Sequence, residues 1–316
     1  MLSIGIDIGG TKVLGALVDT SGTVTLEKRI PSPAQDPDQM VEVVASLITE
    51  LADAAGQELE AVGVAAAGFI DATGSTVLYA PNLKWRNEPL RERLEQRTKL
   101  AVVIENDANA AGWAEFRFGA GQGTKDMAML TLGTGVGGAI ISDGQLRRGG
   151  FGIAGELGHI RVVRDGRPCG CGRKGCVEQY ASGTALLNAA KALVASNDPA
   201  AAMLAELSPS AEQLTGQHIA QALLAGDSGA RALIEDLGQY LGEAMGSITE
   251  ALDPEVYVIG GGLSEAGELV LEPIRRSFEA EVPANGFRPV AKVVGANFSN
   301  QAGVIGAADL ARQSLR

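Results

Sequence analysis

The sequence predicts an α/β protein that consists of two similar domains, and three observations support this fold class. Short apolar segments that end in glycine alternate with longer segments in which apolar residues recur at helical spacing. Residues 2–30 read as strand, glycine turn, strand, turn and strand, and residues 126–144 begin in the same way. An offset of 124 aligns the two segments, so that Gly9 falls on Gly133. Such an internal repeat indicates a duplicated domain with a cleft between its halves.

The first half of the chain predicts a mixed sheet covered by helices. Its first three strands are joined through glycine and serine without an intervening helix, so we expect them to pair antiparallel. Two helical segments and two buried strands then alternate. The predicted strands are residues 2–10, 12–19, 23–30, 59–71 and 101–107, and the predicted helices are residues 36–56 and 89–100.

The second half becomes mostly helical from Glu178 onward. The expected helices cover residues 178–195, 201–207, 216–226, 228–252 and 301–312, and segment 254–267 adds a buried strand that ends in three glycines. The last helix is rich in Gly and Ala, which permits close packing, so we expect it to return to the first domain. The pattern predicts a small N-terminal α/β domain of residues 1–108 plus 301–316 and a larger α/β domain of residues 109–300.

Composition and charge narrow the class of protein. Of the 316 residues, 46% are apolar, which is enough for a packed core. The net charge of −12 argues against a nucleic-acid partner, because such proteins usually carry a basic face. No apolar run reaches the roughly 20 residues that cross a bilayer, and the N-terminus lacks the pattern of a signal peptide. We therefore expect a cytoplasmic protein that binds neither nucleic acid nor membrane.

Two glycine turns have the composition of phosphate-binding loops. Residues 7–12, DIGGTK, join two strands, and their backbone N–H groups and the Thr11 hydroxyl can converge on a phosphate oxygen. Asp7 ends the first strand, where its carboxylate is placed to hold Mg²⁺ through water. Residues 132–138, LGTGVGG, repeat the turn, so the two loops together predict a polyphosphate clamp. A third turn, residues 259–267, is either a helix start or a flat surface for a nucleotide base.

The three cysteines of the chain predict a structural zinc site. Cys169, Cys171 and Cys176 lie within eight residues of one another, and His159 precedes them. One imidazole and three thiolates form a ligand set for tetrahedral zinc, and four protein ligands leave no open position for catalysis. A clustered, odd number of cysteines in a reducing compartment also fits metal binding better than disulfides. We therefore expect Zn²⁺ to stabilise this loop.

Polar residues beside the zinc loop and in the segment IENDANAAGWAE predict a sugar site. Glu156 and Glu178 flank the zinc loop, and the remaining ring nitrogen of His159 can donate a hydrogen bond to a ligand. Carboxylates, amides and an imidazole together suit a polyhydroxylated ligand. In the second segment a buried strand ends in a cluster of polar side chains. Asn106 or Asp107 is also expected to cap the helix that follows, because both residue types are common N-caps.

Four motifs resemble the signatures of the ROK family of repressors, open-reading-frame products and sugar kinases. They are IGIDIGGTK at residues 4–12, LGTGVGGAII at 132–141, GELGHI at 155–160 and CGCGRKGCVEQYASG at 169–183. The resemblance extends from Ile4 to the final helix, and the cysteine motif followed by Glu178 is its most specific part. The segments APNLKWRNEPL and ENDANAAGWAEFRFGAG are similar to ATP-dependent glucokinases of actinobacteria. The resemblance implies duplicated actin-like ATPase and hexokinase-type (ribonuclease H-like) domains around a cleft.

The resemblance also implies a role for each matching residue. Asp107 would be the general base that takes the proton from the sugar 6-hydroxyl. Asp7 is its rival, although a position beside the first glycine loop suits Mg²⁺ better. The sugar would contact Gly68, Asn82, Asn106, Asp107, Glu156, His159 and Glu178. ATP would contact Asp7, Gly9, Gly10, Thr11, Lys12, Thr134 and Gly135, with Gly260, Gly261 and Gly262 beneath the adenosine. Zinc would bind His159, Cys169, Cys171 and Cys176.

The function implied by the resemblance is glucokinase activity, the transfer of the ATP γ-phosphate to the 6-hydroxyl of glucose at the start of glycolysis. Two alternatives remain open: a ROK kinase for fructose, mannose or an N-acetylhexosamine, and a glucokinase that uses inorganic polyphosphate. A non-enzymatic ROK repressor is less expected, because the first phosphate loop begins at Ile4 and leaves no room for a preceding DNA-binding helix-turn-helix. The resemblance further implies a homodimer or a homotetramer.

Overall fold

Two compact units make up the chain. The computed structural model describes residues 1–314, except for the side chain of Pro81. The first unit consists of Met1–Ala128, Gly138–Gly155 and the segment that begins at Asn297, and the second consists of Met129–Gly137 and Glu156–Ala296. Residues 109–128, 138–155 and 297–300 thus lie in the first unit, although the predicted boundaries assign them to the larger domain. Part of this difference arises because α3 (Asp107–Phe118) packs against the C-terminal helix α10 (Ala302–Ser314), which belongs to the first unit.

The first unit contains a five-stranded sheet with the order β3-β2-β1-β4-β8. Its strands are β1 (Leu2–Ile8), β2 (Lys12–Asp19), β3 (Val24–Pro31), β4 (Leu59–Ala66) and β8 (Val102–Asn106). β1, β2 and β3 pair antiparallel, while β4 lies parallel to both β1 and β8. The predicted antiparallel start and the mixed sheet are both confirmed.

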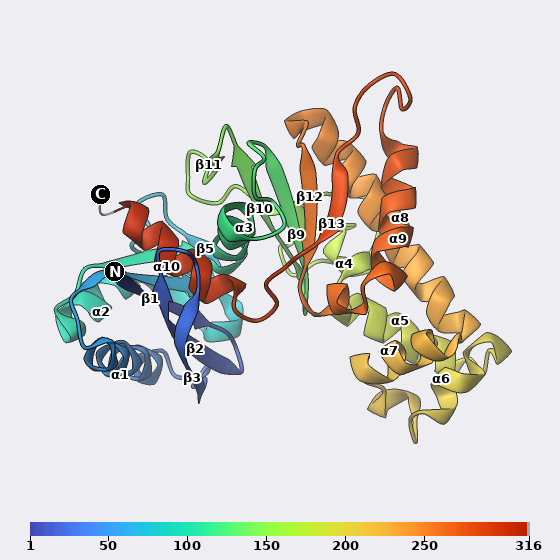
Figure 1. Ribbon diagram of the computed structural model, residues 1–316. Helices are drawn as coiled ribbons and strands as arrows, with labels where there is room; N and C mark the ends of the chain where they lie inside the picture. The colour runs from blue at the N-terminus through green and yellow to red at the C-terminus, as the bar shows by residue number, and fades with distance from the viewer. Residues whose placement is uncertain (315–316) are drawn as a thin grey trace. The chain divides into compact units, whose positions relative to one another are not determined.

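Helices cover both faces of this sheet (Figure 1). Successive side chains along each strand point to opposite faces, so alternate residues contact the helices of one face or the other. Ile4, Ile6 and Ile8 share a core cluster with the apolar side of α1 (Pro37–Ala55) and with α2 (Leu90–Thr98). On the other face Gly5 makes room for α10, since a Cβ atom at this position would lie 1.9 Å from the Val304 carbonyl oxygen. The prediction that the last helix packs on the first domain is confirmed.

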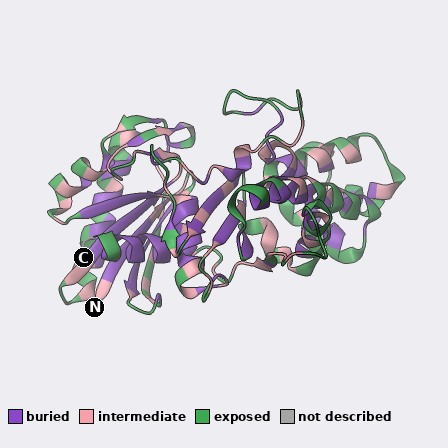
Figure 2. Ribbon diagram, turned by 90° about the horizontal axis from the view of Figure 1, so that it is seen from above, coloured by how far each residue is buried: buried purple, intermediate pink, exposed green. Residues whose placement is uncertain are grey.

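The second sheet repeats the topology of the first. Its order is β11-β10-β9-β12-β13. The strands are β9 (Met127–Leu132), β10 (Val136–Ser142), β11 (Gln145–Leu146), β12 (Val256–Gly260) and β13 (Lys292–Gly295). When the strands of each sheet are counted in chain order, both sheets have the spatial order third, second, first, fourth, fifth. β12 and β13 are parallel, and so are β4 and β8. This shared order confirms the duplication, and Figure 2 shows the central strands of both sheets as mostly buried.

The helical part of the second unit differs from the prediction in two ways, because residues 268–281 form a helix that is not among the expected ones and because one expected helix is broken. Its helices are η2 (Leu157–His159), α4 (Glu178–Ala181), α5 (Gly183–Ala195), η3 (Pro199–Ala201), α6 (Ala202–Glu206), η4 (Ala211–Gln213), α7 (Gly216–Ala225), α8 (Ser228–Leu252), η5 (Gly262–Ala266) and α9 (Glu268–Glu281). The single helix expected over residues 178–195 breaks at Ser182, whose extended backbone and hydroxyl cap α5 by accepting the Ala185 N–H. Among the described residues, no helix has the length and apolarity to cross a bilayer.

A small three-stranded sheet in the first unit is not predicted, although its first strand falls within the strand expected over residues 59–71, which breaks after Ala66. It has the order β5-β6-β7 and consists of β5 (Phe69–Ile70), β6 (Val77–Ala80) and β7 (Trp85–Glu88), with η1 (Pro81–Leu83) before the last strand. Its strands are too short to show a clear alternation of apolar and polar residues. Trp85 is nonetheless fully buried and belongs to the same core cluster as Ile4. The small sheet therefore extends the core of the first unit.

Candidate functional site

The first glycine loop is the tight turn between β1 and β2. The Gly9 N–H donates to the Lys12 carbonyl oxygen at 3.0 Å, which closes the turn, and the side of Gly10 faces open space. Thr11 is exposed, and the Lys12 ammonium donates to Asn300 Oδ1 at 3.1 Å. The four residues assigned to phosphate therefore lie together on an accessible turn of the first unit.

Asp7 lies at the end of β1, directly before this loop. It packs against the first turn of α10, where a Cβ atom on Gly303 would come within 2.7 Å of Asp7 Oδ2. Burial, together with the negative charge of Asp107, raises the pKa of Asp7 from 3.8 to about 7, although Lys12 opposes the rise. Two carboxylates, Asp7 and Asp107, thus influence each other within the first unit.

Asp107 is the first residue of α3, at the point where β8 ends. Its Oδ1 accepts the Ala108 N–H at 2.9 Å, so one carboxylate oxygen is held by the helix backbone. Burial raises the pKa of Asp107, and the Ala108 hydrogen bond acts in the opposite direction. A carboxylate with a raised pKa at a helix N-terminus is a suitable proton acceptor for a hydroxyl group.

Asn106 is the N-cap of α3, which confirms Asn106 rather than Asp107 among the two predicted cap residues. Its Oδ1 accepts the Asn109 N–H at 3.0 Å, and its Nδ2 donates to the Gly68 carbonyl oxygen at 3.0 Å. The amide oxygen is therefore engaged in the cap, and the Asn106 side chain also forms a hydrogen bond with the Asp107 carboxylate that lowers the pKa of Asp107. The structure thereby joins two residues, Gly68 and Asn106, that the resemblance assigns to the sugar.

Gly68 owes its conformation to the small sheet. Its φ of +122° is unfavourable for other residues, and a Cβ atom here would lie 2.4 Å from the Tyr79 carbonyl oxygen and 2.8 Å from the Ala80 Cβ. Asn82 follows Ala80 closely, in η1, and is exposed. Gly68, Asn82, Asn106 and Asp107 thus belong to neighbouring segments of the first unit.

The four predicted zinc ligands lie together in the second unit. The ligand atoms of His159, Cys169, Cys171 and Cys176 are all within 4.8 Å of one another. The Cys171 and Cys176 sulfurs are 3.7 Å apart, and the Cys169 sulfur is 3.6 Å from His159 Nδ1. Zn–S and Zn–N bonds of about 2.3 and 2.05 Å at tetrahedral angles give ligand separations of about 3.8 and 3.6 Å. These side chains could hold a metal ion with little rearrangement.

The three thiols of the cluster differ in burial, and burial affects how readily a thiol loses its proton. Cys169 and Cys176 are buried, whereas Cys171 is exposed. Burial, followed by the neighbouring thiols, raises the pKa of Cys176 to about 12, so this thiol stays protonated when no cation is near. A metal ion reverses this preference because it stabilises the thiolate directly. The chemistry of the donor set therefore agrees with its geometry.

His159 turns its two nitrogens in different directions. Nδ1 faces the cysteine cluster, and Nε2 lies 3.9 Å from Glu156 Oε2. A metal-bound Nδ1 leaves the proton on Nε2, where it can be donated. This arrangement agrees with the expected roles of His159 in the zinc site and of His159 and Glu156 in the sugar site, both of which stay predictions.

Glu178 connects the cysteine cluster with the second glycine loop. Its Oε2 accepts the Val136 N–H at 3.1 Å, and a Cβ atom on Gly135 would lie 2.3 Å from the same oxygen. The other oxygen, Oε1, is 3.9 Å from the Cys169 sulfur. Within the second unit, a residue expected to bind sugar is thus in contact with the loop expected to bind phosphate.

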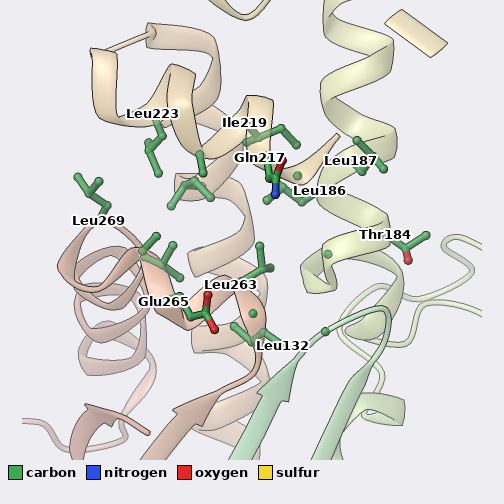
Figure 3. A pocket seen from close by; sticks show the side chains of 18 of the residues that line it. Leu132, Thr184, Leu186, Leu187, Gln217, Ile219, Leu223, Leu263, Glu265 and Leu269 are labelled. Carbon is green, nitrogen blue, oxygen red and sulfur yellow. The ribbon is translucent and has the colours of Figure 1, made fainter. Parts of the chain in front are cut away.

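A cavity of about 650 Å³ lies beside the second glycine loop (Figure 3). Thr134 and Gly262, two residues assigned to ATP, are part of its wall. Gly261, with φ +83°, lies against the backbone of Leu132, where a Cβ atom would approach to 2.6 Å. Close contact between the ends of β9 and β12 therefore requires glycine at position 261.

Most of the cavity wall consists of residues that the sequence analysis does not single out. They come from α5, α7, α8, η5 and α9 and include Leu186, Leu187, Gln217, Ile219, Leu223, Leu263, Glu265 and Leu269. Their leucines follow the helical spacing of core residues, so the pattern alone assigns them to the interior. Figure 3 shows these side chains surrounding the open space, with Gln217 and Glu265 as polar groups among apolar ones.

Replacing Asp7 by Asn will stabilise the first unit at pH 8 but not at pH 4. A carboxyl whose pKa rises on folding loses stability as the pH increases from its unfolded value of 3.8 to its folded value of about 7. The variant lacks this loss, so its free energy of unfolding should exceed that of the wild type by about 2 to 4 kcal/mol at pH 8. Urea unfolding at both pH values without Mg²⁺ measures the difference. Asp53→Asn, on the exposed side of α1, should change neither value, and an equal gain for both variants would contradict the prediction.

Comparison with known proteins shows which family the chain belongs to. A model of the ROK family matches residues 3–314. A glucokinase from Streptomyces coelicolor is 44% identical over 313 residues, which cover 99% of this chain and 98% of that protein. An N-acetylmannosamine kinase from Escherichia fergusonii is 35% identical over 316 residues, 99% of either protein.

A solved structure gives the same result. The crystal structure of a ROK family glucokinase from Streptomyces griseus in complex with glucose and AMPPNP superposes with a TM-score of 0.90 at 46% identity, over 99% of this chain and all of that one. The chain belongs to the ROK family. The predicted family and its α/β fold are thereby confirmed.

Proposed function

We propose that this chain is an ATP-dependent glucokinase with Asp107 as the general base. The observation that carries the proposal is the Asp107 carboxylate, which is held at the start of α3 next to Asp7 in a chain that is 44% identical over its length to a glucokinase. Phosphoryl transfer to a primary alcohol requires alignment, neutralisation of phosphate charge and a late proton acceptor. The first glycine loop, Asp7 and Asp107 offer these three elements.

In this mechanism each residue acts on one part of the substrates. Gly68, Asn82, Asn106, Glu156, His159 and Glu178 would orient glucose. The oxygen of the sugar 6-hydroxyl attacks the γ-phosphorus while Asp107 accepts the hydroxyl proton. In the same step the bond between the γ-phosphorus and the β-phosphate oxygen breaks. Asp7 would hold Mg²⁺, which neutralises charge on the phosphates. The N–H groups of both glycine loops would bind the phosphate oxygens.

Zinc has a structural role in this proposal. With the four ligands His159, Cys169, Cys171 and Cys176, the ion would fix the His159 ring so that Nε2 points away from the cluster. We also propose that the protein forms a homodimer or a homotetramer, as the family resemblance implies. Light scattering over a range of concentrations would test the assembly, and a mass equal to that of one chain would contradict it.

The substrate is tested with a panel of sugars in a coupled kinase assay. Glucose should give by far the highest kcat/KM, with mannose, fructose, N-acetylglucosamine and N-acetylmannosamine as the compared acceptors. Equal rates with fructose or with an N-acetylhexosamine would overturn the assignment to glucose and favour a function like that of the N-acetylmannosamine kinase relative.

The apolar cavity favours a nucleotide over inorganic polyphosphate as the phosphate donor. Leu187 is only half-buried in the cavity wall, so Leu187→Glu should fold normally and place a charge beside the adenosine. We expect the KM for ATP to rise about tenfold or more, because an apolar contact is lost and a carboxylate is brought towards an anionic ligand. The KM for glucose should not change. Leu207→Glu, at an exposed leucine outside the cavity, is the control. An unchanged KM for ATP in Leu187→Glu would place the adenosine elsewhere.

A further inference from the structure

Glu105 is a buried carboxylate at the end of β8, directly before the residues assigned to glucose and to catalysis. Its side chain is only 5% exposed. Taking a carboxylate out of water is costly unless hydrogen bonds and an opposite charge replace the solvent. A residue that only filled this space would not need to carry a charge. The partners of Glu105 therefore indicate what the charge is for.

Three donors surround the Glu105 carboxylate. Oε1 accepts the backbone N–H of Asn106 at 2.9 Å and the side-chain amide of Asn109 at 3.0 Å. Oε2 accepts from Arg148 Nε at 2.6 Å, which forms an ion pair. Hydrogen bonds to charged groups are shorter and stronger than those between neutral groups, so this carboxylate is a firm anchor for all three.

Two of these donors belong to the segment that positions Asp107. The Asn106 N–H lies in the chain directly before Asp107, and Asn109 is in the first turn of the same helix. Asn106 is in turn held through its side chain by the Asn109 N–H and the Gly68 carbonyl oxygen. Glu105 thus restrains the backbone of Asn106, while Asn109 and Gly68 restrain the Asn106 side chain.

The third donor comes from a different part of the first unit. Arg148 follows β11, and its carbonyl oxygen accepts the Ala154 N–H at 3.0 Å, which closes the loop that ends at Gly155. A Cβ atom on Gly155 would lie 3.3 Å from Asn109 Oδ1, so the end of this loop also lies against the first turn of α3. The guanidinium both neutralises Glu105 and fixes the loop on the base of the helix.

We propose that Glu105, neutralised by Arg148, is a positioning residue for phosphoryl transfer: it fixes Asn106 and the start of α3 so that the Asp107 carboxylate meets the sugar hydroxyl. Glu105 touches neither substrate in this role. The inference rests on the proposed function, since it assigns to Glu105 and Arg148 a part in the reaction of Asp107. Misplacing a catalytic group by about 1 Å can cost two orders of magnitude in rate while leaving ligand affinity nearly unchanged.

Glu105→Gln tests the proposal. Glutamine keeps an oxygen for the Asn106 and Asn109 donors but turns an amide donor towards Arg148, so the ion pair is lost at nearly constant shape. We expect kcat per glucose-binding site to fall about 10- to 100-fold, with KM and calorimetric Kd for glucose within about threefold of the wild type. Arg148→Met, at a residue that is 38% exposed, should reproduce the effect if Glu105→Gln fails to fold, and Arg148→Lys should restore part of it. In the double variant the loss should not exceed that of the more severe single variant, because both remove one interaction.

Glu115→Gln is the matched control. Glu115 is a second buried carboxylate, in α3 towards the end of the helix that is far from Asp107, and it accepts the Ala120 and Phe298 N–H groups. This variant should lower the Tm without changing kcat per glucose-binding site. A kcat for Glu105→Gln within twofold of the wild type, an equal loss of kcat in Glu115→Gln, or a raised glucose Kd at unchanged kcat would overturn the inference alone. A wild-type chain that phosphorylated no sugar would overturn the proposed function and this inference with it.

Discussion

Replacing Asp107 by Asn will abolish glucose phosphorylation and leave glucose bound. Asparagine keeps the shape of the side chain and can still accept the Ala108 N–H, so the start of α3 should be preserved. It cannot accept the hydroxyl proton, and loss of a general base typically costs a factor of about 10² to 10⁴ in kcat. A coupled assay gives kcat, and calorimetric titration gives the Kd for glucose, which should stay within about threefold of the wild type.

The same experiment decides between the two carboxylates of the first unit. Asp7 is the rival candidate for the base, and the negative charge of Asp107 contributes to its raised pKa. Under our assignment, Asp7→Asn raises the Mg²⁺ concentration needed for half-maximal rate, whereas Asp107→Asn leaves that concentration unchanged. Turnover near that of the wild type in Asp107→Asn, with loss of turnover at all Mg²⁺ concentrations in Asp7→Asn, would exchange the two roles.

Replacing His159 by Gln will abolish binding at the proposed zinc site and weaken glucose binding. The cluster would keep three sulfur ligands, of which buried Cys176 prefers to be protonated when no cation is present. Since metal binding contributes to folding, we expect the free energy of unfolding to fall by about 3 kcal/mol or more and the glucose KM to rise at least about tenfold. Elemental analysis, urea unfolding and the coupled assay measure the three quantities.

The chain contains its own control for this substitution. His218 is the other histidine; it lies in the first turn of α7, where it forms a capping box with Thr215. His218→Gln should keep one metal ion per chain and a normal glucose KM, with only the small loss of stability expected for a weakened cap. Metal retained in full by His159→Gln would show that the cysteine loop does not bind the ion as proposed.

The sequence predicts those parts of the fold that repeat or that follow a strong periodicity. The offset of 124 between the glycine turns already indicates the duplication, and the two sheets have the same strand order. The grouping of the cysteines with His159 also follows from the sequence, because the geometry of a metal ion restricts which residue types can surround it.

Other features depend on contacts that a single segment does not reveal. Ser182 interrupts an apolar helical pattern because its hydroxyl caps α5, and the periodicity on both sides gives no sign of the break. The leucines of the cavity, such as Leu186 and Leu223, have the spacing of core residues and come to line a cavity only through the arrangement of several elements that are distant in the sequence. Glu105 appears in the sequence as one more polar residue, and its importance emerges only with Arg148, 43 positions later in the chain.

The packing of α10 on Gly5 and on α3 has a consequence for the order in which the protein matures during synthesis. The first unit needs this helix to cover one face of its sheet, and α10 is translated after every residue of the second unit. Domains generally form as the nascent chain emerges, with the N-terminal part first. Here the N-terminal part must wait, with the face of β1 around Gly5 uncovered, until the ribosome has completed the rest. A pause in translation before residue 302 would therefore leave this face of the first unit exposed to chaperones and proteases.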